Sequence, residues 1–402
     1  MDLKSGYPFW AVKNGLLATF PPLDRDARCD VAVIGAGISG ALIAHELARH
    51  GHDVLVLDER DVAWGSTAAS TALIQYEIDT HLSDLARCHG LASALLAYRA
   101  CVEAVGMLRA IAKHWRDAGW RDADSLYYAS RARDAKPLAE EFALRRAHGF
   151  DVEWLDAARL RERYGFAAPA AILNRPAAGF DPYRLTCRLL QRLQRDGARV
   201  VDRTRVDAIR ARSRDVLLTT REGLEIRAAH VVVAAGYATQ RWLTQRVAYN
   251  RSSYAFVTDP IDPALLGPLA DTVLWESARP YRYLRATADH RLIVGGEDDA
   301  IDVPARRDRR VAKKACRLLE RVREQFPTLP LQPTFSWAGT FAETRDGLPW
   351  FGAHPQYGPR VLFAMAYGGN GITYSTLGAG LLRALIERRT HPLKALFGFG
   401  RV

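Results

Sequence analysis

Short apolar runs and a helical segment alternate near the start of the chain. Val31–Ile34 and Val54–Leu57 are apolar runs rich in valine, which is typical of buried parallel strands. Ala41–His50 lies between them with the apolar spacing of a helix, and Gly51 follows as a helix-ending residue. This strand–helix–strand order predicts the first unit of an α/β fold with a parallel sheet.

The turn between the first strand and the helix carries three glycines at G-x-G-x-x-G spacing. Gly35, Gly37 and Gly40 provide a tight turn, close approach of the backbone to a pyrophosphate, and close helix–strand packing. Asp58 ends the second strand, where an acid commonly hydrogen-bonds a ribose hydroxyl. A glycine turn alone is a weak signal, but the strands, the helix and the acid together predict a dinucleotide-binding, Rossmann-like unit.

The rest of the chain shows helical and strand-like patterns in turn. Apolar residues at helical spacing predict one or two helices over Leu82–Gly119, and others over Lys136–Gly149, Ala157–Tyr164, Tyr183–Asp196, Val311–Phe326 and Ile372–Arg389. Short apolar or alternating runs predict strands at Leu126–Ala129, Val200–Thr204, Val206–Ala211, Val216–Thr219, His230–Gly236, Ser252–Thr258, Tyr281–Ala286, Arg291–Gly296, Thr334–Thr340 and Val361–Ala366.

A discontinuous two-domain organisation follows from this order. His230–Gly236 (HVVVAAG) is a buried run that returns the chain to the first sheet. We expect a nucleotide-binding domain of residues 1–80, 176–245 and 335–402, and a second, α+β domain of residues 81–175 and 246–334 built on an antiparallel sheet. The chain has 402 residues, 49% of them hydrophobic, which is enough for both cores.

Composition bears on compartment and partners. Met1–Phe20 does not resemble a signal peptide, and the most apolar window, Val31–Ala44, is too short to span a bilayer. The five cysteines are scattered and form no C-x-x-C pair, which fits a reducing cytoplasm and predicts no metal cluster: Cys29, Cys88, Cys101, Cys187 and Cys316. The net charge of +11 is spread along the chain, so a nucleic-acid partner is not favoured, and Arg306–Lys314 is the densest basic segment.

Several motifs occur together in one order along the chain. The glycine turn at Gly35–Gly40 and the HVVVAAG strand are followed by the turn Thr344–Pro349 (TRDGLP) and by Gly368–Thr373 (GGNGIT). This arrangement resembles the D-amino-acid oxidase-like FAD-dependent oxidoreductases, which include glycine oxidase, sarcosine oxidase and gamma-glutamylputrescine oxidase. The resemblance covers essentially the whole chain and implies a Rossmann-like FAD-binding domain beside a substrate-binding domain.

The resemblance also implies which residues hold FAD. Those at the pyrophosphate, the ribose, the adenine, the ribityl chain and the flavin would be Gly35, Gly37, Ile38, Ser39, Gly40, Asp58, Glu59, Arg60, Ser66, Thr67, Val206, Ala235, Gly236, Gly369, Asn370, Gly371, Ile372 and Thr373. The last five precede and begin a predicted helix, whose first N–H groups would stabilise negative charge on the flavin.

Three positions depart from the family pattern. Phe341 stands where glycine oxidase-like members have an arginine for the substrate carboxylate, and Ile293 where sarcosine oxidase-like members have a lysine that promotes reaction with oxygen. Neither Cys316 nor a histidine within Ser66–Ile74 matches a covalent attachment site. We therefore expect non-covalent FAD, and either oxygen or a quinone or other electron carrier as acceptor.

The substrate side is expected on the strand Tyr281-Arg282-Tyr283. Alternation sends Arg282 to one face and both tyrosines to the other, and the sequence leaves open which face lines the pocket. Arg282 in the pocket could hold an anionic group, but it could equally be a surface arginine between core tyrosines. Tyr254 on a neighbouring strand is a further candidate, although a core tyrosine is the commoner case. No catalytic acid or base stands out.

The favoured function is oxidation of a C–N bond in a small amine or amino-acid-like substrate, by hydride transfer to FAD and hydrolysis of the imine. Two alternatives stay open. Related FAD domains act on a modified tRNA base, although no RNA-binding motif is visible here. The chain could also be a non-catalytic FAD-carrying subunit of an electron-transfer complex.

Overall fold

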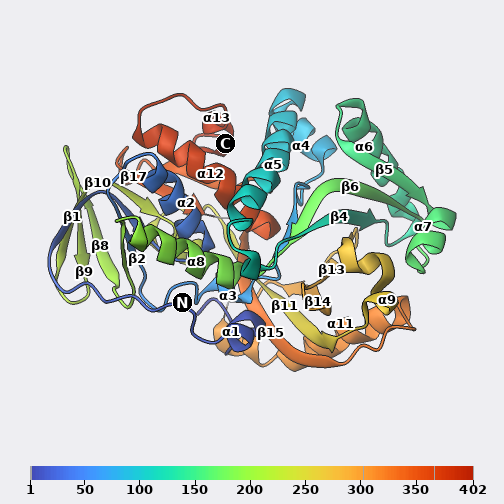
Figure 1. Ribbon diagram of the computed structural model, residues 1–402. Helices are drawn as coiled ribbons and strands as arrows, with labels where there is room; N and C mark the ends of the chain where they lie inside the picture. The colour runs from blue at the N-terminus through green and yellow to red at the C-terminus, as the bar shows by residue number, and fades with distance from the viewer. Residues whose placement is uncertain (1, 302, 366, 402) are drawn as a thin grey trace.

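A computed structural model describes residues 2–301, 303–365 and 367–401 and shows two sheets side by side (Figure 1). The first sheet has eight strands in the order β16-β17-β10-β1-β2-β7, with β9 beside β10 and β8 beside β9. Its central pairs are parallel. The strands are β1 (Ala27–Ile34), β2 (Val54–Leu57), β7 (Arg199–Val201), β8 (Val206–Ala211), β9 (Val216–Thr220), β10 (Glu225–Val233), β16 (Trp350–Ala353) and β17 (Val361–Met365).

The second sheet has nine strands, in the order β15-β11-β14-β13-β12-β4-β6-β3 with β5 beside β6. All its pairs are antiparallel except β12 with β4. The α/β and antiparallel parts expected from the sequence are therefore confirmed. The strands are β3 (Leu73–Gln75), β4 (Arg121–Tyr128), β5 (Asp151–Asp156), β6 (Ala170–Gly179), β11 (Tyr249–Pro260), β12 (Thr272–Glu276), β13 (Arg282–Ala286), β14 (Arg291–Asp299) and β15 (Pro333–Glu343).

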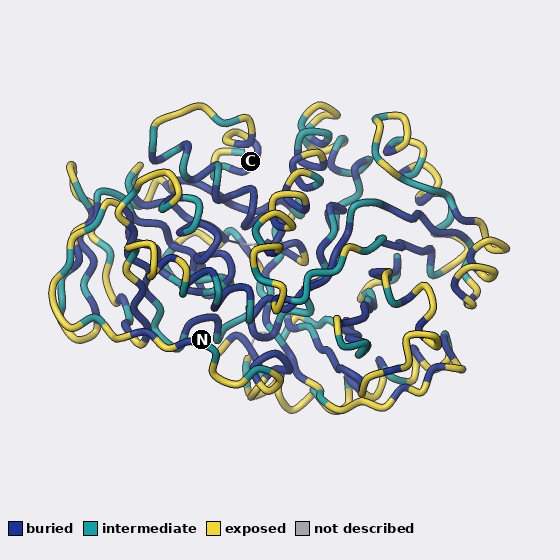
Figure 2. The backbone as a smooth tube through the Cα atoms, in the orientation of Figure 1, coloured by how far each residue is buried: buried dark blue, intermediate teal, exposed yellow. Residues whose placement is uncertain are grey.

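Helices cover both sheets. They are α1 (Phe9–Asn14), α2 (Ile38–Arg49), α3 (Ser66–Ala69), α4 (Leu82–His89), α5 (Leu91–Ala112), α6 (Ala135–Ala147), α7 (Ala157–Tyr164), α8 (Pro182–Arg195), α9 (Pro263–Leu266), α10 (Pro304–Asp308), α11 (Val311–Gln325), α12 (Gly371–Ile386) and α13 (Lys394–Phe397). The backbone of the central strands is buried, whereas the outer helices and turns are exposed (Figure 2).

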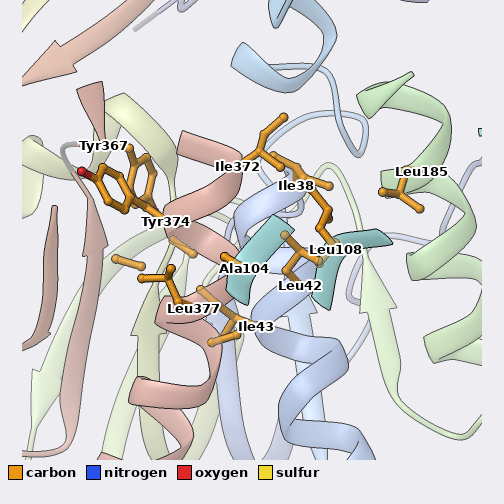
Figure 3. Packing of buried hydrophobic residues seen from close by; sticks show 14 of the residues in the cluster. Ile38, Leu42, Ile43, Ala104, Leu108, Leu185, Tyr367, Ile372, Tyr374 and Leu377 are labelled. Atoms are coloured by element: carbon orange, nitrogen blue, oxygen red, sulfur yellow. The ribbon is translucent and has the colours of Figure 1, made fainter. Parts of the chain in front are cut away.

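The largest core lies between α2, α12 and α5. Ile38 and Leu42 of α2 pack near Leu377 of α12 and Leu108 of α5 (Figure 3). These side chains are at most 7% exposed, so their burial contributes roughly 1.5–3 kcal/mol each. The packing fixes the N-terminal ends of α2 and α12 in one region of the molecule, although the two helices are far apart in sequence.

Helix α5 is long and apolar enough, by length and composition, to cross a membrane. In this fold, however, Ala97, Cys101 and Leu108 of α5 are fully buried in the main core. The helix packs against α4 and α12. One face of α5 is therefore buried in the core of this fold.

The structure refines the predicted elements. The helix expected over Leu82–Gly119 is divided into α4 and α5 by Gly90, whose φ of 79° is left-handed. Strands β3 and β15 belong to the second sheet, whereas the FAD domain expected from the sequence includes residues 1–80 and 335–402. The strands β3, β5, β6, β12 and β16 were not predicted, and the predicted end of a strand at Ala366 lies outside the described residues.

Candidate active site

One large cavity opens where the two sheets meet. Its empty volume, including the solvent in its open mouth, is about 1900 Å³. The first sheet lines it at Gly35 and Ala234, and the second at Tyr283 and Trp337. The cavity therefore extends from the first sheet to the second.

The first end of the cavity is the turn from β1 into α2. Gly35 has a φ of 113°, and a side chain there would run into the backbone of Ala234. A side chain at Gly40 would meet the carbonyl oxygen of Gly35, so this glycine permits close packing and does not line the cavity. Gly37 lines the cavity and is the N-cap of α2, where it has no side chain to cap the helix. This is the geometry of a phosphate-binding turn.

Asp58 lies at the carboxyl end of β2 and holds this turn in place. Its Oδ2 accepts the N–H of Ala36 at 2.8 Å, and its Oδ1 accepts the N–H of Arg60 at 2.9 Å. Burial raises the pKa of Asp58 to about 6, against these two hydrogen bonds. Each oxygen keeps a second lone pair, so the carboxylate can also accept a ribose hydroxyl.

The flank of the turn comes from α3 and from the strand β8. Thr67 of α3 accepts the N–H of Ile38 at 2.9 Å and so connects α3 to α2. Ser66 and Val206 line the same part of the cavity. Glu59 lines it as well and forms an ion pair with Arg241 at 3.2 Å.

The second end of the cavity is the turn from β17 into α12. Gly369, Asn370, Gly371, Ile372 and Thr373 all line it. The N–H of Gly369 is already used, because it donates to Oδ2 of Asp79 at 3.1 Å. The amides at the first turn of α12 have no intrahelical partner. They are the better candidates for a bound anionic group.

Between these ends, the cavity is walled by one face of the second sheet. Tyr281 and Tyr283 line it, whereas Arg282 does not. The guanidinium of Arg282 lies on the other face, where it donates to Tyr128 and to Gln325 of α11 at 2.8 and 2.7 Å. The expectation that Arg282 contacts the substrate is therefore wrong, because the alternation of the strand turns its side chain toward α11.

Tyr254 needs a similar correction. The residue borders the cavity, but its hydroxyl donates to Asp299 at 3.1 Å and its ring lies under Lys314 of α11. It is 1% exposed. The side chain is therefore a core tyrosine on the α11 face of the sheet, which is the commoner of the two alternatives that the sequence left open for Tyr254.

Several cavity residues were not anticipated from the sequence. Asp79, Asp298, Trp275, Trp337 and Tyr237 all line the cavity. They come from separate elements and loops, and no local motif marks them. Ala235, Gly236 and Ser39, which the family resemblance did indicate, line it too.

The residues present fit FAD. Gly37 leaves a cradle in which a Cβ would lie 3.0 Å from the Thr67 hydroxyl. In the first turn of α2, the N–H of Ile38 donates to Thr67, and the N–H groups of Ser39 and Gly40 have no intrahelical partner. Asp58 supplies the acceptor for a ribose at the expected place. Within the described part of the chain, no cysteine or histidine lines the cavity.

The three positions that departed from the family pattern have clear locations. Phe341 lines the cavity, so an apolar ring is present there. Ile293 is fully buried in β14 and does not line the cavity. Cys316 is exposed on α11, outside the cavity.

Comparison with known proteins agrees with this geometry. Residues 30–385 match the family model of DAO, FAD dependent oxidoreductases. Glycine oxidase of Geobacillus kaustophilus (strain HTA426) is 28% identical over 374 residues, which cover 90% of this chain and 94% of that protein. Gamma-glutamylputrescine oxidoreductase of Escherichia coli (strain K12) is 23% identical over 94% of this chain and 88% of its own length.

The fold is similar to a solved structure as well. The crystal structure of glycine oxidase from Geobacillus kaustophilus superimposes with a TM-score of 0.79 and 23% identity, covering 94% of this chain and 99% of that one. Because the family model spans most of the chain, this protein belongs to the DAO family of FAD-dependent oxidoreductases, and FAD is its cofactor.

Proposed function

We propose that this enzyme oxidises a C–N bond of a small amine or amino-acid-like substrate, with FAD bound non-covalently. The observation that carries the proposal is that one continuous cavity joins the phosphate-binding turn of α2 to the aromatic wall of Tyr281 and Tyr283. The names of the relatives, glycine oxidase and gamma-glutamylputrescine oxidoreductase, support the same substrate class.

The chain's own residues would bind and position the reactants. The first turn of α2 and Thr67 would face the pyrophosphate, and Asp58 would accept a ribose hydroxyl. The first-turn amides of α12 would face the flavin end and favour negative charge there. Tyr281 and Tyr283 would cover the substrate and exclude water.

The cofactor would be the oxidant that accepts two electrons from the substrate. The reacting amine would be in its neutral form, so an amine that arrives as its ammonium ion would first lose a proton to water. The C–H bond beside nitrogen would then break with its hydrogen leaving as hydride, while the nitrogen lone pair forms the C=N bond of an iminium ion. Bound FAD supplies the hydride acceptor. Water then hydrolyses the imine to a carbonyl compound and an amine or ammonia.

Charge distribution gives little support to an RNA substrate. The basic segment Arg306–Lys314 lies at α10 and α11, where Arg310 and Lys314 form ion pairs with Asp299 and Glu297. Arg307 is buried and donates to the carbonyl oxygen of Asp2 and to Thr340. Much of this segment's charge is therefore used within the fold.

A dye-linked screen tests the proposal. Purified FAD-loaded protein is mixed with a redox dye and with panels of amines, amino acids, and alcohols or hydroxy acids of matched size. We expect dye reduction with members of the first two panels. Reduction with alcohols or hydroxy acids alone would refute C–N oxidation.

A further inference from the structure

Three consecutive acidic residues end the strand β14, and their side chains alternate between the two faces of the sheet. Glu297 accepts from Lys314 of α11 at 3.3 Å, and Asp299 accepts from Arg310 at 3.0 Å. Asp298, between them, faces the cavity on the other side of the sheet. The two outer carboxylates have cationic partners on the helical side, and the middle one is turned away from them.

Asp298 has little of its charge compensated by the protein. Its Oδ1 is buried and has no hydrogen-bond partner in the described structure, while the Ser253 hydroxyl provides one hydrogen bond to the carboxylate. Asp298 as a whole is half-buried, but a carboxylate oxygen that is itself buried without a donor is costly. An unpartnered oxygen in the wall of a ligand cavity therefore indicates a ligand that donates to it.

The surroundings of Asp298 are acidic and aromatic. Asp79 lies at the same end, where its Oδ2 accepts the N–H of Gly369. The rings of Tyr281 and Tyr283 are 5.8 Å apart, and Trp275 is 6.4 Å from Tyr281. Aromatic faces beside carboxylates are the usual surroundings of a bound ammonium group.

Basic side chains are few here. Among the described residues that line the cavity, the only cations are Arg60 and Arg241, and both lie beside Glu59 at the ribose end. Arg279 is exposed outside the lining, with its guanidinium stacked 4.6 Å from the Tyr281 ring centre and donating to the carbonyl oxygen of Asp79. It approaches Asp298 without forming an ion pair with it.

Several charged groups act on Asp298. Burial raises the pKa of Asp298 to about 7, with like charge from Asp79 and Glu343 adding to the effect and Arg279 opposing it. Glu343 is itself paired with Arg251. Tyr281 and Tyr283 also face this carboxyl. The balance at this end of the cavity is negative, which a bound cation would relieve.

We propose that the substrate is a cation without a carboxylate at this end, and that Asp298, with Asp79 and the two tyrosine rings, holds its positively charged nitrogen group. This rests on the proposed function and specifies its substrate class. An amino acid that presented its carboxylate to this end would meet Asp79 and Asp298 with no opposing cation in the lining.

Calorimetric titration of the FAD-loaded enzyme tests the inference. The probes are butylamine, which is an ammonium ion at neutral pH, 4-aminobutanoate, which adds a carboxylate to the same amine, and butanoate. We expect butylammonium to bind at least about tenfold more tightly than either carboxylate. Asp298→Asn should weaken butylammonium binding by roughly ten- to a hundred-fold, the size of a lost charge-assisted hydrogen bond.

Asp299→Asn is the matched control, because it removes the same charge from the next residue on the α11 side. It should leave butylammonium affinity within about twofold. The inference is overturned if butylammonium does not bind, if the carboxylates bind as tightly, or if Asp298→Asn has no larger effect than Asp299→Asn.

Different results would refute the cation site and the proposed oxidation of a C–N bond. If amino acids with free carboxylates reduce the dye and butylammonium shows no preference, C–N oxidation stands and the cation site is refuted. If butylammonium binds through Asp298 and only alcohols reduce the dye, the cation site stands and C–N oxidation is refuted.

Discussion

Oδ2 of Asp58 accepts the main-chain N–H of Ala36 at 2.8 Å, so the acid that ends β2 also holds the turn that begins α2. This bond joins the two parts of the nucleotide motif. The acid is a ligand for the ribose in the proposed site and also a support for the phosphate-binding turn.

Replacing Asp58 should therefore affect both FAD affinity and the turn. Asp58→Ala removes the acceptor of two main-chain N–H groups as well as the ribose contact. We expect the Kd for FAD to rise roughly ten- to a hundred-fold, with Asp58→Asn in between because its amide oxygen still accepts one bond. Fluorescence titration of the apoprotein measures this, and an unchanged Kd would contradict the assignment.

Substitutions at two glycines of the turn should affect FAD binding and folding separately. Gly37→Val puts a side chain into the proposed pyrophosphate cradle and should abolish FAD binding while the apoprotein stays folded. Gly40→Val should instead reduce folded protein, because its side chain would meet the carbonyl of Gly35. Gly106→Val, with open space around it on α5, is the control. A fully FAD-loaded Gly37→Val protein would refute the cradle.

The raised pKa of Asp298 predicts a pH effect on the apoprotein. The folded-state pKa of about 7 exceeds the unfolded value of about 3.9, so the native state binds more protons between those pH values. The protonated carboxyl of Asp298 therefore makes its full contribution to the free energy of unfolding below about pH 4. That contribution is lost as the pH rises to 7, by at most about 1.4 kcal/mol per pH unit.

Denaturant unfolding from pH 4 to 8 tests this effect. Asp298→Asn cannot ionise, so its free energy of unfolding should rise relative to wild type as the pH increases. Glu222→Gln, on an exposed turn, should follow the wild-type profile. A constant difference between Asp298→Asn and wild type would show that the carboxyl titrates as in the unfolded chain.

The charged groups that line the cavity also bear on which electron acceptor the reduced enzyme uses. No lysine lines the described cavity, Ile293 is buried in the sheet, and Arg282 faces α11, so none of these side chains can stabilise superoxide as oxygen takes its first electron. Asp79 and Asp298 would oppose that anion. We expect substrate-reduced enzyme to reoxidise faster with a quinone or dye than with oxygen.

Stopped-flow reoxidation at matched acceptor concentrations measures these rates. Oxygen reacting as fast as the quinone or dye would identify an oxidase and contradict this expectation.

The sequence predicts the parts of this protein that are local. The turn at Gly35–Gly40 is recognisable from the spacing of its own glycines, although a Cβ at Gly35 would meet Ala234 and one at Gly37 would meet Thr67, both of which are remote in sequence. The strand β1 and the helix α2 follow from their apolar patterns. Asp58 follows from its place at the end of a strand.

The substrate end could not be predicted, because it is assembled from distant segments. Asp298 lies in an acidic run that looks like a solvent-exposed strand end, and only pairing with α11 shows that Glu297 and Asp299 face the other way. The strand alternation at Arg282 was visible, but the side covered by α11 was not. Strands β3 and β15 likewise join the second sheet through partners remote in sequence.

Anaerobic reduction of the bound cofactor tests the central claim most directly. FAD-loaded enzyme is mixed, without oxygen, with an amine that is active in the dye screen, and both the oxidised-flavin absorbance and the carbonyl product are measured. We predict that the absorbance is lost and that one carbonyl molecule forms per flavin after hydrolysis. Flavin that stays oxidised with every amine and amino acid, but is reduced by an alcohol or hydroxy acid, would contradict the account.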